Sequence, residues 1–402
     1  MIRAQQFLRD NAKSPNAIAY AVMAVGALAF PAIIQFANNG NGDYLVSVAA
    51  DGGVYVLLAI GLNVVVGFAG LLDLGYAAFF AIGSYTYGML ASMQLISSPI
   101  HHAVHIPFWI ALFIGMFVAA GAGALLGAPT LRLRGDYLAI VTLGFGEIVP
   151  RFFRNMRDWT SGVNGISALD VPTLPFWITG PWASTQLAIE HTFRFASSNP
   201  TAWYVLIVVL IVISVIGVNN LYGSRLGRAW MAVREDETAA AAMGVNTVNT
   251  KLLAFAIGAS FSGFAGAFYG AKLSLVSPDS FGFVVSITIL SMVVLGGMGN
   301  IPGAMIGALL LYSVLYYFLP AAPAQASALA HSLGMDWLNH SSPNGWPGIS
   351  EFIHRLQFIM FGLILVGIML LRPQGLLPSR LRAQELKRGV HDEPVAAAAA
   401  GV

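Results

Sequence analysis

The sequence predicts an all-α integral membrane protein, and its composition and its apolar runs support that prediction. Hydrophobic residues make up 57% of the chain and charged residues only 9%, whereas a soluble domain is about a quarter charged. The apolar runs are continuous and about twenty residues long, which suits a helix crossing a bilayer and lacks the alternation of a barrel strand. The 43 Gly residues are typical of helices that pack closely in lipid.

About ten transmembrane helices are expected in a domain at residues 18–378. The apolar runs are Ile18–Phe36, Leu45–Val66, Leu74–Leu95, Pro107–Leu126, Tyr137–Phe153, Trp203–Val218, Leu252–Leu273, Phe281–Leu295, Gly303–Leu319 and Phe358–Leu371. We interpret the first run as an uncleaved span, because no clear small-residue cleavage site follows it. The segment before it, 1–17, is polar, and the tail 379–402 is predicted to be disordered.

The positions of Lys and Arg predict that both termini are cytoplasmic. With that orientation most of the 20 basic residues lie inside, as the positive-inside rule requires. Six basic residues remain on the outer side, and three of them, Arg151, Arg154 and Arg157, cluster at the outer end of the fifth run. The other three are Arg194, Lys272 and Arg355. The same orientation makes two long segments, 155–202 and 320–357, external loops.

A polar interval at residues 219–251 separates the sixth and seventh apolar runs. Its charged residues are Arg225, Arg228, Arg234, Glu235, Asp236, Glu237 and Lys251. A charge at the bilayer centre costs roughly 2.5 to 3.5 kcal/mol, so this interval lies outside the membrane. Its middle, from Ala229 to Met243, has no Gly or Pro and is rich in good helix formers, which predicts one short helix that faces a soluble partner.

Two glycine-rich segments, 67–75 and 296–303, join the second run to the third and the eighth to the ninth. Two interpretations remain open: broken helices that line a solute route, or tight cytoplasmic turns with close packing. Under the first, the candidate route residues are Asn63, Gly67, Gly70, Asp73, Gly75, Glu147, Gly296, Gly299 and Asn300. For Asn63 an interhelical hydrogen bond is the favoured role.

Two sets of polar residues have simple structural explanations. Glu147 lies inside the fifth run and is a functional candidate for that reason, yet Arg151 stands four residues later and is expected to pair with it. His101, His102 and His105 lie in an external loop without a nearby acidic residue, so no metal site is expected there.

Missing motifs exclude several classes of protein. The sequence has no GxxxxGK[ST] phosphate loop, no HExxH and no Ser/His/Asp arrangement on an apparent cavity, so neither an ATPase nor another enzyme is expected. It contains no Cys, and its net charge of +2 is too small to indicate nucleic acid. No buried charge pair is expected, which argues against an ion-driven carrier. These observations favour a solute-moving subunit that binds no cofactor and uses energy supplied by another protein.

Several blocks of the sequence resemble the LivM-type permeases of branched-chain amino-acid ABC importers. They are Gly61–Tyr85, Leu131–Val149, Gly227–Gly270, Ser286–Leu310 and the closing Leu371–Pro378. The resemblance implies a bacterial inner-membrane subunit that pairs with a second, LivH-like permease and with two cytoplasmic ABC ATPases, which use ATP and Mg²⁺. It also implies a periplasmic amino-acid-binding protein that delivers Leu, Ile or Val.

The resemblance assigns a role to the polar interval as well. Gly227–Val245 matches the coupling segment that contacts the ATPase, and Glu237-Thr-Ala-Ala with Gly244 is similar to the EAA-then-Gly signature of import permeases. The implied coupling residues are Arg228, Arg234, Glu235, Asp236, Glu237 and Gly244. Ala241 stands where many relatives carry Glu, and Pro150 where relatives often have Arg. Three alternatives stay open: an importer of urea or short amides, a stand-alone channel or secondary carrier, and a membrane enzyme.

Overall fold

The computed structural model is almost entirely helical. The residues that it describes are 15–37, 42–96, 98–99, 101–102, 104–130, 136–172, 195, 199–338, 348–371 and 375–377. Most of the expected N-terminal segment 1–17 and all of the tail 379–402 lie outside the described residues, so the predictions for them and for the side of each terminus stay predictions.

Each expected apolar run coincides with a helix. The long helices are α2 (Pro15–Ala37), α3 (Asp43–Leu62), α4 (Tyr76–Leu90), α5 (Phe108–Thr130), α6 (Asp136–Asn155), α10 (Pro200–Gly223), α13 (Thr247–Leu273), α14 (Phe283–Gly296), α15 (Ile301–Ser313), α16 (Leu319–Ser332) and α17 (Ile349–Leu371). Wider π-helical turns, η1 (Asn63–Phe68) and η5 (Val314–Phe318), continue α3 and α15. The all-α fold class is therefore confirmed.

Six helical segments in the described part of the chain are long and apolar enough to cross a membrane. They are Asp43–Phe68, Phe108–Pro129, Pro200–Gly223, Thr247–Leu273, Pro278–Gly296 and Ile301–Ser332. The chain is thus a multi-pass membrane protein, while the count of ten spans stays a prediction. Helix α4, for example, has only 15 residues, because the segment before it is not helical and a short strand follows.

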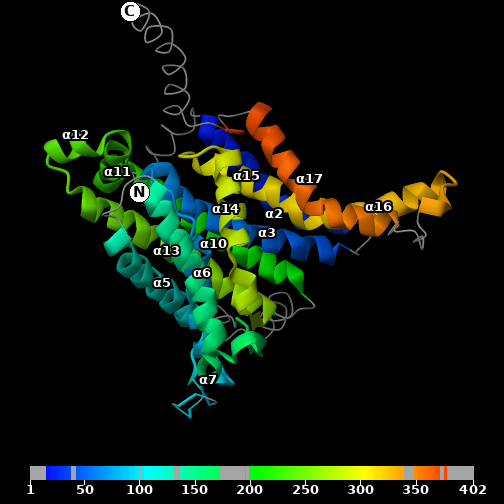
Figure 1. Cartoon of the computed structure of the whole chain (residues 1–402), viewed down its shortest axis with the longest axis horizontal. Coiled ribbons are helices and arrows are strands. Elements are labelled where there is room, and N and C mark those ends of the chain that lie inside the picture. The colour runs from blue at the N-terminus through cyan, green and yellow to red at the C-terminus, as the bar shows by residue number, and fades with distance from the viewer. Residues whose placement is uncertain are drawn as a thin grey trace, which may run out of the picture.

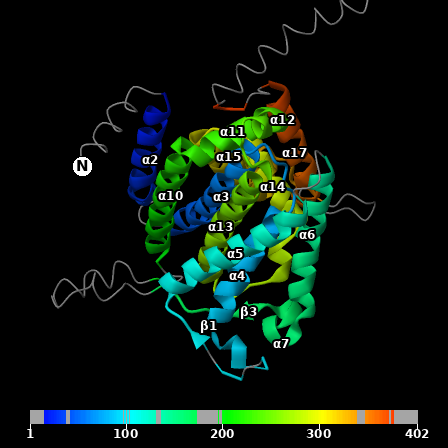
Figure 2. The same ribbon diagram turned by 90° about the vertical axis from the view of Figure 1, so that its left-hand side faces the viewer.

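Helices α3 and α13 form the centre of the molecule. Helix α13 packs against α3, α4, α5 and α10, and the others surround this group (Figures 1 and 2). Small residues permit the close approach, since a Cβ on Gly83 of α4 would lie 2.3 Å from Cα of Gly263 on α13. This close packing is what the many glycines of the sequence predicted.

The two ends of the molecule differ in structure. The short helices α11 (Arg225–Glu235) and α12 (Glu237–Ala242) lie at one end, and α7 (Arg157–Thr160) lies at the other (Figure 1). Four short strands pair antiparallel, β1 (Ala91–Ser92) with β2 (Val104–His105) and β3 (Ile166–Ser167) with β4 (Leu275–Val276). Short 3₁₀ turns lie near these strands at η2 (Met93–Ile96), η3 (Gly162–Asn164) and η4 (Pro278–Phe281). A further 3₁₀ turn, η6 (Asp336–Leu338), follows α16.

One histidine of the expected external loop does have an acidic partner. Nδ1 of His105 lies 2.6 Å from Oδ2 of Asp170. The expectation that no acidic residue is near was wrong, because folding brings together two residues that are distant in sequence. Within the described ranges no group of three or more possible metal ligands is found.

The expected loop 320–357 begins as a helix. Helix α15 continues through η5 into α16 as far as Ser332, and α17 starts at Ile349 rather than at Phe358. The ninth expected run stops just before Pro320, and proline disfavours a helix interior, because it lacks an N–H donor and its ring crowds the carbonyl four residues earlier. That carbonyl belongs to Tyr316, which lies within the wider π turn, so the helix passes the proline.

Candidate functional site: a glycine junction and a helix pair

The polar interval folds as two helices rather than the single helix predicted for Ala229–Met243. The break lies at Asp236, whose backbone is extended and whose carboxylate accepts hydrogen bonds from the N–H groups of Thr238 and Ala239 at 2.7 and 2.9 Å. Aspartate is a strong N-cap, and here the capping outweighs the helix propensity of the surrounding residues. Asp236 therefore starts α12.

Gly244 ends α12. Its φ of +86° lies in the left-handed region, which glycine adopts without a steric penalty. Its N–H donates to the carbonyl of Ala241 at 3.0 Å, and the N–H of Val245 donates to the carbonyl of Ala240 at 3.1 Å. This bonding pattern is the Schellman closure of a helix. Gly244 of the predicted coupling segment therefore fixes the turn that ends α12.

Two side chains attach α11 and α12 to the start of α13. A carboxylate oxygen of Glu237 lies 2.6 Å from Nζ of Lys251, whose side chain is only 8% exposed. The indole N–H of Trp230 donates to the carbonyl of Thr250 at 2.8 Å. Glu237, which was expected to face a soluble partner, thus forms an ion pair within the chain.

Arg234 connects α11 to the first glycine-rich segment. Its Nη1 donates to the carbonyl oxygen of Gly67 at 2.6 Å, and its Cγ would lie 2.7 Å from a Cβ on Gly70. Arg228 behaves differently, because it is exposed and donates to the carbonyl of Gly223 just before α11. Of these two arginines, Arg234 is the one that reaches a glycine-rich segment, whereas Arg228 bonds to the end of α10 close by in sequence.

The two glycine-rich segments contact each other. Oδ1 of Asn63 accepts a hydrogen bond from the N–H of Gly299 at 2.8 Å. A Cβ on Gly67 would lie 2.2 Å from that Oδ1 and 2.5 Å from the nitrogen of Gly299, so only glycine fits. Asn63 therefore forms a hydrogen bond between distant segments, as predicted, but its partner lies in the turn between α14 and α15 rather than in a helix. Whether the turns also line a solute route stays a prediction.

The closing motif of the sequence completes this contact. The side-chain amide of Asn300 donates to the carbonyl of Leu377 at 2.8 Å. The N–H groups of Leu376 and Leu377 donate to the carbonyls of Leu295 and Gly296 at 2.8 and 3.0 Å. We call this assembly the glycine junction; its members are Asn63, Gly67, Gly70, Gly296, Gly299, Asn300, Leu376 and Leu377.

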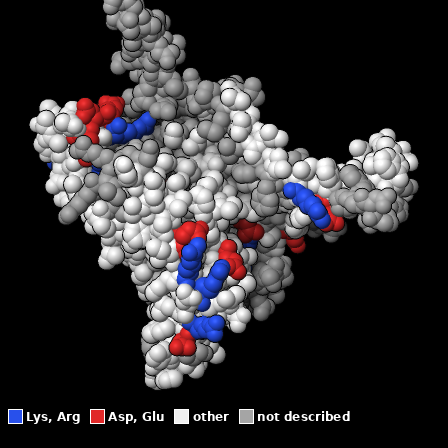
Figure 3. All heavy atoms as spheres, in the orientation of Figure 1, with Lys and Arg blue, Asp and Glu red and all other residues white. Residues whose placement is uncertain are grey.

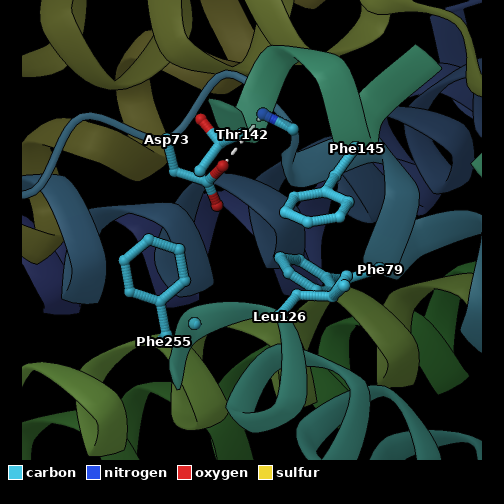
Figure 4. Close-up of a pocket in the computed structure, with 8 residues that line it drawn as sticks. Asp73, Phe79, Leu126, Thr142, Phe145 and Phe255 are labelled. Carbon is cyan, nitrogen blue, oxygen red and sulfur yellow. Dashed lines mark hydrogen bonds between the residues drawn. The ribbon is translucent and has the colours of Figure 1, made fainter. Parts of the chain in front are cut away.

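Asp73 and Gly75 lie beside the junction at a small pocket. Oδ1 of Asp73 accepts from the N–H of Gly75 at 2.9 Å, and the carboxyl group is buried. Burial raises the pKa of the Asp73 carboxyl to about 6, although hydrogen bonds from Gly75 and Thr142 lower it. Figure 4 shows Phe79, Phe145 and Phe255 around this pocket, with Asp73 and Thr142 on one side of it. The lining residues are Asp73, Gly75, Phe79, Leu126, Gly127, Thr142, Phe145 and Phe255.

Glu147 is paired as expected. On α6 one of its carboxylate oxygens lies 3.2 Å from Nη2 of Arg151, and both side chains are exposed. It takes no part in the hydrogen bonds of the glycine junction described above.

Comparison with known proteins identifies the family. The family model described as branched-chain amino acid transport system / permease component matches residues 44–369. The chain belongs to this family. The resemblance to LivM-type permeases is therefore confirmed, and the match includes α3 to α16 and nearly all of α17.

Individual relatives agree with this result. The permease is 39% identical over 342 residues to the high-affinity branched-chain amino acid transport system permease protein LivM of Escherichia coli K12, covering 84% of this chain and 70% of that protein. It is 28% identical over 269 residues to LivH of the same organism, covering 65% and 80%. A probable LivM of Methanocaldococcus jannaschii is 24% identical over 353 residues, covering 82% and 91%. No solved structure matches.

The permease also contains an ion pair that was not expected from the sequence. Nζ of Lys272 on α13 lies 2.6 Å from Oδ1 of Asp51 on α3 and donates to the carbonyl of Ser47 at 2.8 Å. The Lys272 side chain is 6% exposed, so the expectation of no buried charge pair was wrong. The sequence did contain an indication of this pair, because Asp51 and Lys272 are each the only charged residue in their apolar runs.

Replacing Gly67 with Ala is expected to destabilise the permease by about 1 to 3 kcal/mol, the usual effect of overpacking. The added methyl group would overlap Asn63 and the backbone of Gly299. Thermal unfolding of the purified chain in detergent measures the effect. Gly217→Ala is the matched control, because nothing lies within 4 Å of a Cβ there. Equal unfolding temperatures for the two variants would contradict the close contact.

Proposed function

We propose that this chain is the permease subunit of a binding-protein-dependent ABC importer for the branched-chain amino acids Leu, Ile and Val. In this proposal it lies in a bacterial inner membrane and pairs with a second, LivH-like permease. Two cytoplasmic ATPases supply the energy, and a periplasmic amino-acid-binding protein delivers the solute. The names of the relatives support the solute class.

The observation that carries the proposal is the position of the α11–α12 pair. The pair lies at one end of the molecule, and its outer surface is exposed at Glu235, Ala241 and Ala242, with Met243 85% exposed (Figure 1). On its inner side the same pair is attached to α13 and, through Arg234, to the glycine junction. A helix pair fixed in this way can transmit a rigid-body displacement to the long helices.

Movement of α12 can reach the long helices through three contacts. A displacement of α12 by a closing ATPase dimer would reach α13 through the Glu237–Lys251 ion pair and α3 through Arg234 and Gly67. The hydrogen bond from Gly299 to Asn63 would carry it on to α14 and α15. These three contacts make the ends of four helices move together, which is what alternating access between two sides of a membrane needs.

The proposed contact with the ATPase is mainly apolar. Ala241 and Ala242 are small and exposed, and Met243 projects beside them. Where many relatives carry Glu, Ala241 removes one polar group, and the flexible Met243 side chain can fill a groove on the partner. In this proposal ATP and Mg²⁺ are bound by the ATPases and not by this chain.

Met243→Glu is expected to weaken retention of the ATPase subunits by about tenfold or more, because it places a charge in the centre of an apolar contact. Co-purification of the ATPases with the permease measures retention. Val163→Glu is the control, since Val163 is also an exposed apolar residue, 59% exposed, and belongs to η3, which packs against α7. Helix α7 lies at the opposite end of the molecule. Full retention in Met243→Glu would contradict the docking site.

Reconstitution of the whole system tests the function itself. Proteoliposomes that contain both permeases and both ATPases should take up labelled leucine only when ATP and the binding protein are present. Uptake of urea without leucine uptake would overturn the solute assignment. Transport by this chain alone would instead identify a channel or a secondary carrier.

A further inference from the structure

Helix α6 has a charged flank that its own fold leaves exposed. The opposite side of the helix is buried at Leu138, Thr142, Gly146, Pro150 and Phe153. On the exposed flank the side chains of Arg151 and Glu147 are 73% and 39% exposed. Arg154 pairs there with Asp279 of η4, and these two side chains are 46% and 63% exposed. Figure 3 shows basic and acidic side chains gathered over α6 and α7, apart from the charged groups over α11–α12 and α17.

Helix geometry gives the positions of these charges along α6. Glu147 lies near the middle of the 20 residues of α6. At 1.5 Å per residue, Arg151 follows about 6 Å farther along the helix, and the bilayer core is about 30 Å thick. The expected topology makes α6 the fifth span, although α6 is not among the six segments that are long and apolar enough to cross a membrane. In that topology a charge near the middle of α6 is strongly disfavoured against lipid, so Glu147 would face protein or a water-filled cavity.

Another helix of the same molecule shows what a lipid-facing surface looks like. On α10 every exposed residue from Val205 to Ile216 is apolar. The exposed flank of α6 carries three charges, Glu147, Arg151 and Arg154, and Asp279 of η4 adds a fourth beside Arg154. Exposed apolar side chains, among them Ile148 and Phe152, lie beside these charges. The exposed surface of α6 is therefore mixed in character, whereas that of α10 from Val205 to Ile216 is purely apolar.

We propose that the flank formed by Glu147, Arg151, Arg154 and Asp279 is the wall of a water-filled solute route that the second permease closes. The zwitterionic head of an amino acid binds there, with its carboxylate on Arg151 and its ammonium group on Glu147. This proposal rests on the proposed function and assigns the solute class to particular side chains.

The chemistry of the flank fits such a solute. An exposed Glu–Arg pair is held weakly, so a solute with one charge of each sign can replace each partner with little cost. The guanidinium group of Arg151 can bind a carboxylate through two parallel hydrogen bonds. Ile148 and Phe152, which are 58% and 54% exposed, lie next to the two charges along the helix and offer apolar surface to a branched side chain.

Substitution of the two charges tests the binding step. Glu147→Gln and Arg151→Gln, each in the complete importer, are expected to lower leucine uptake by about tenfold or more. ATPase co-purification and thermal stability should stay unchanged. The matched control is the pair Glu351→Gln and Arg355→Gln on α17, which has the same spacing, a 2.6 Å contact and similar exposure. Wild-type uptake in the α6 variants would overturn the binding step.

Cysteine labelling tests the water-filled route without relying on transport. The chain has no Cys, so single cysteines can be introduced without removing others. Ile148→Cys is expected to react with a charged, membrane-impermeant thiosulfonate, whereas Ile213→Cys on α10 should not. Equal lack of reaction would overturn the route. If the wild-type importer takes up no leucine while Ile148→Cys reacts, the route stands and the proposed function fails.

Discussion

Replacing Arg234 with Ala is expected to uncouple ATP hydrolysis from transport. Leucine uptake should fall by about tenfold or more, while the ATPases stay bound, because the variant leaves the outer surface of α12 intact. The substitution removes the hydrogen bond from Arg234 to the carbonyl of Gly67 and leaves that carbonyl without its charged donor. The number of leucine molecules taken up per ATP hydrolysed is the appropriate measurement.

Arg228→Ala is the control for this experiment. Arg228 lies on the same helix, but it is exposed and bonds to the carbonyl of Gly223 close by in sequence. Its loss should leave the transport ratio near the wild-type value. Equal ratios in the Arg228 and Arg234 variants would show that the contact with Gly67 does not transmit movement.

Lys272→Met should cause the largest loss of stability, about 3 to 5 kcal/mol, which is typical of removing one partner of a buried ion pair. The carboxylate of Asp51 would remain between α3 and α13 without its cation. Unfolding of the purified permease by heat or denaturant in detergent measures the loss.

The double variant Asp51→Asn with Lys272→Met should recover most of that stability, since it leaves no unpaired charge. Arg355→Gln, in an exposed pair on α17, should change stability by less than about 1 kcal/mol. A Lys272→Met variant as stable as Arg355→Gln would show that the pair is solvated rather than buried.

The positions of the helices could be predicted from the sequence, because bilayer thickness fixes how long an apolar run must be. The ends of the helices were harder to predict. At Asp236 a capping carboxylate competes with the helix propensity of its neighbours, and the wide turn at Val314–Phe318 lets a helix continue past Pro320. Both outcomes depend on local geometry that residue composition does not contain.

The candidate site could be predicted residue by residue but not as an assembly. The pairing of Glu147 with Arg151 follows from their spacing on one helix. The contact of Asn63 with Gly299 joins segments that are far apart in the chain. The pattern of apolar residues does not indicate which distant residues will form such contacts. The same holds for Asp51 and Lys272, although a lone charge in an apolar run signals that some partner exists.

The backbone hydrogen bonds of Leu376 and Leu377 have a consequence for biosynthesis. The carbonyls of Leu295 and Gly296 and the amide of Asn300 find their partners only after the ribosome has made nearly the whole chain. Arg234, Gly67 and Asn63 can come together earlier in synthesis. During membrane insertion the carbonyls at the end of α14 therefore lack the N–H donors of Leu376 and Leu377. Leu376 and Leu377 therefore fix the end of α14 to the start of α15 late in synthesis. A nascent chain stopped before residue 375 lacks these hydrogen-bond partners.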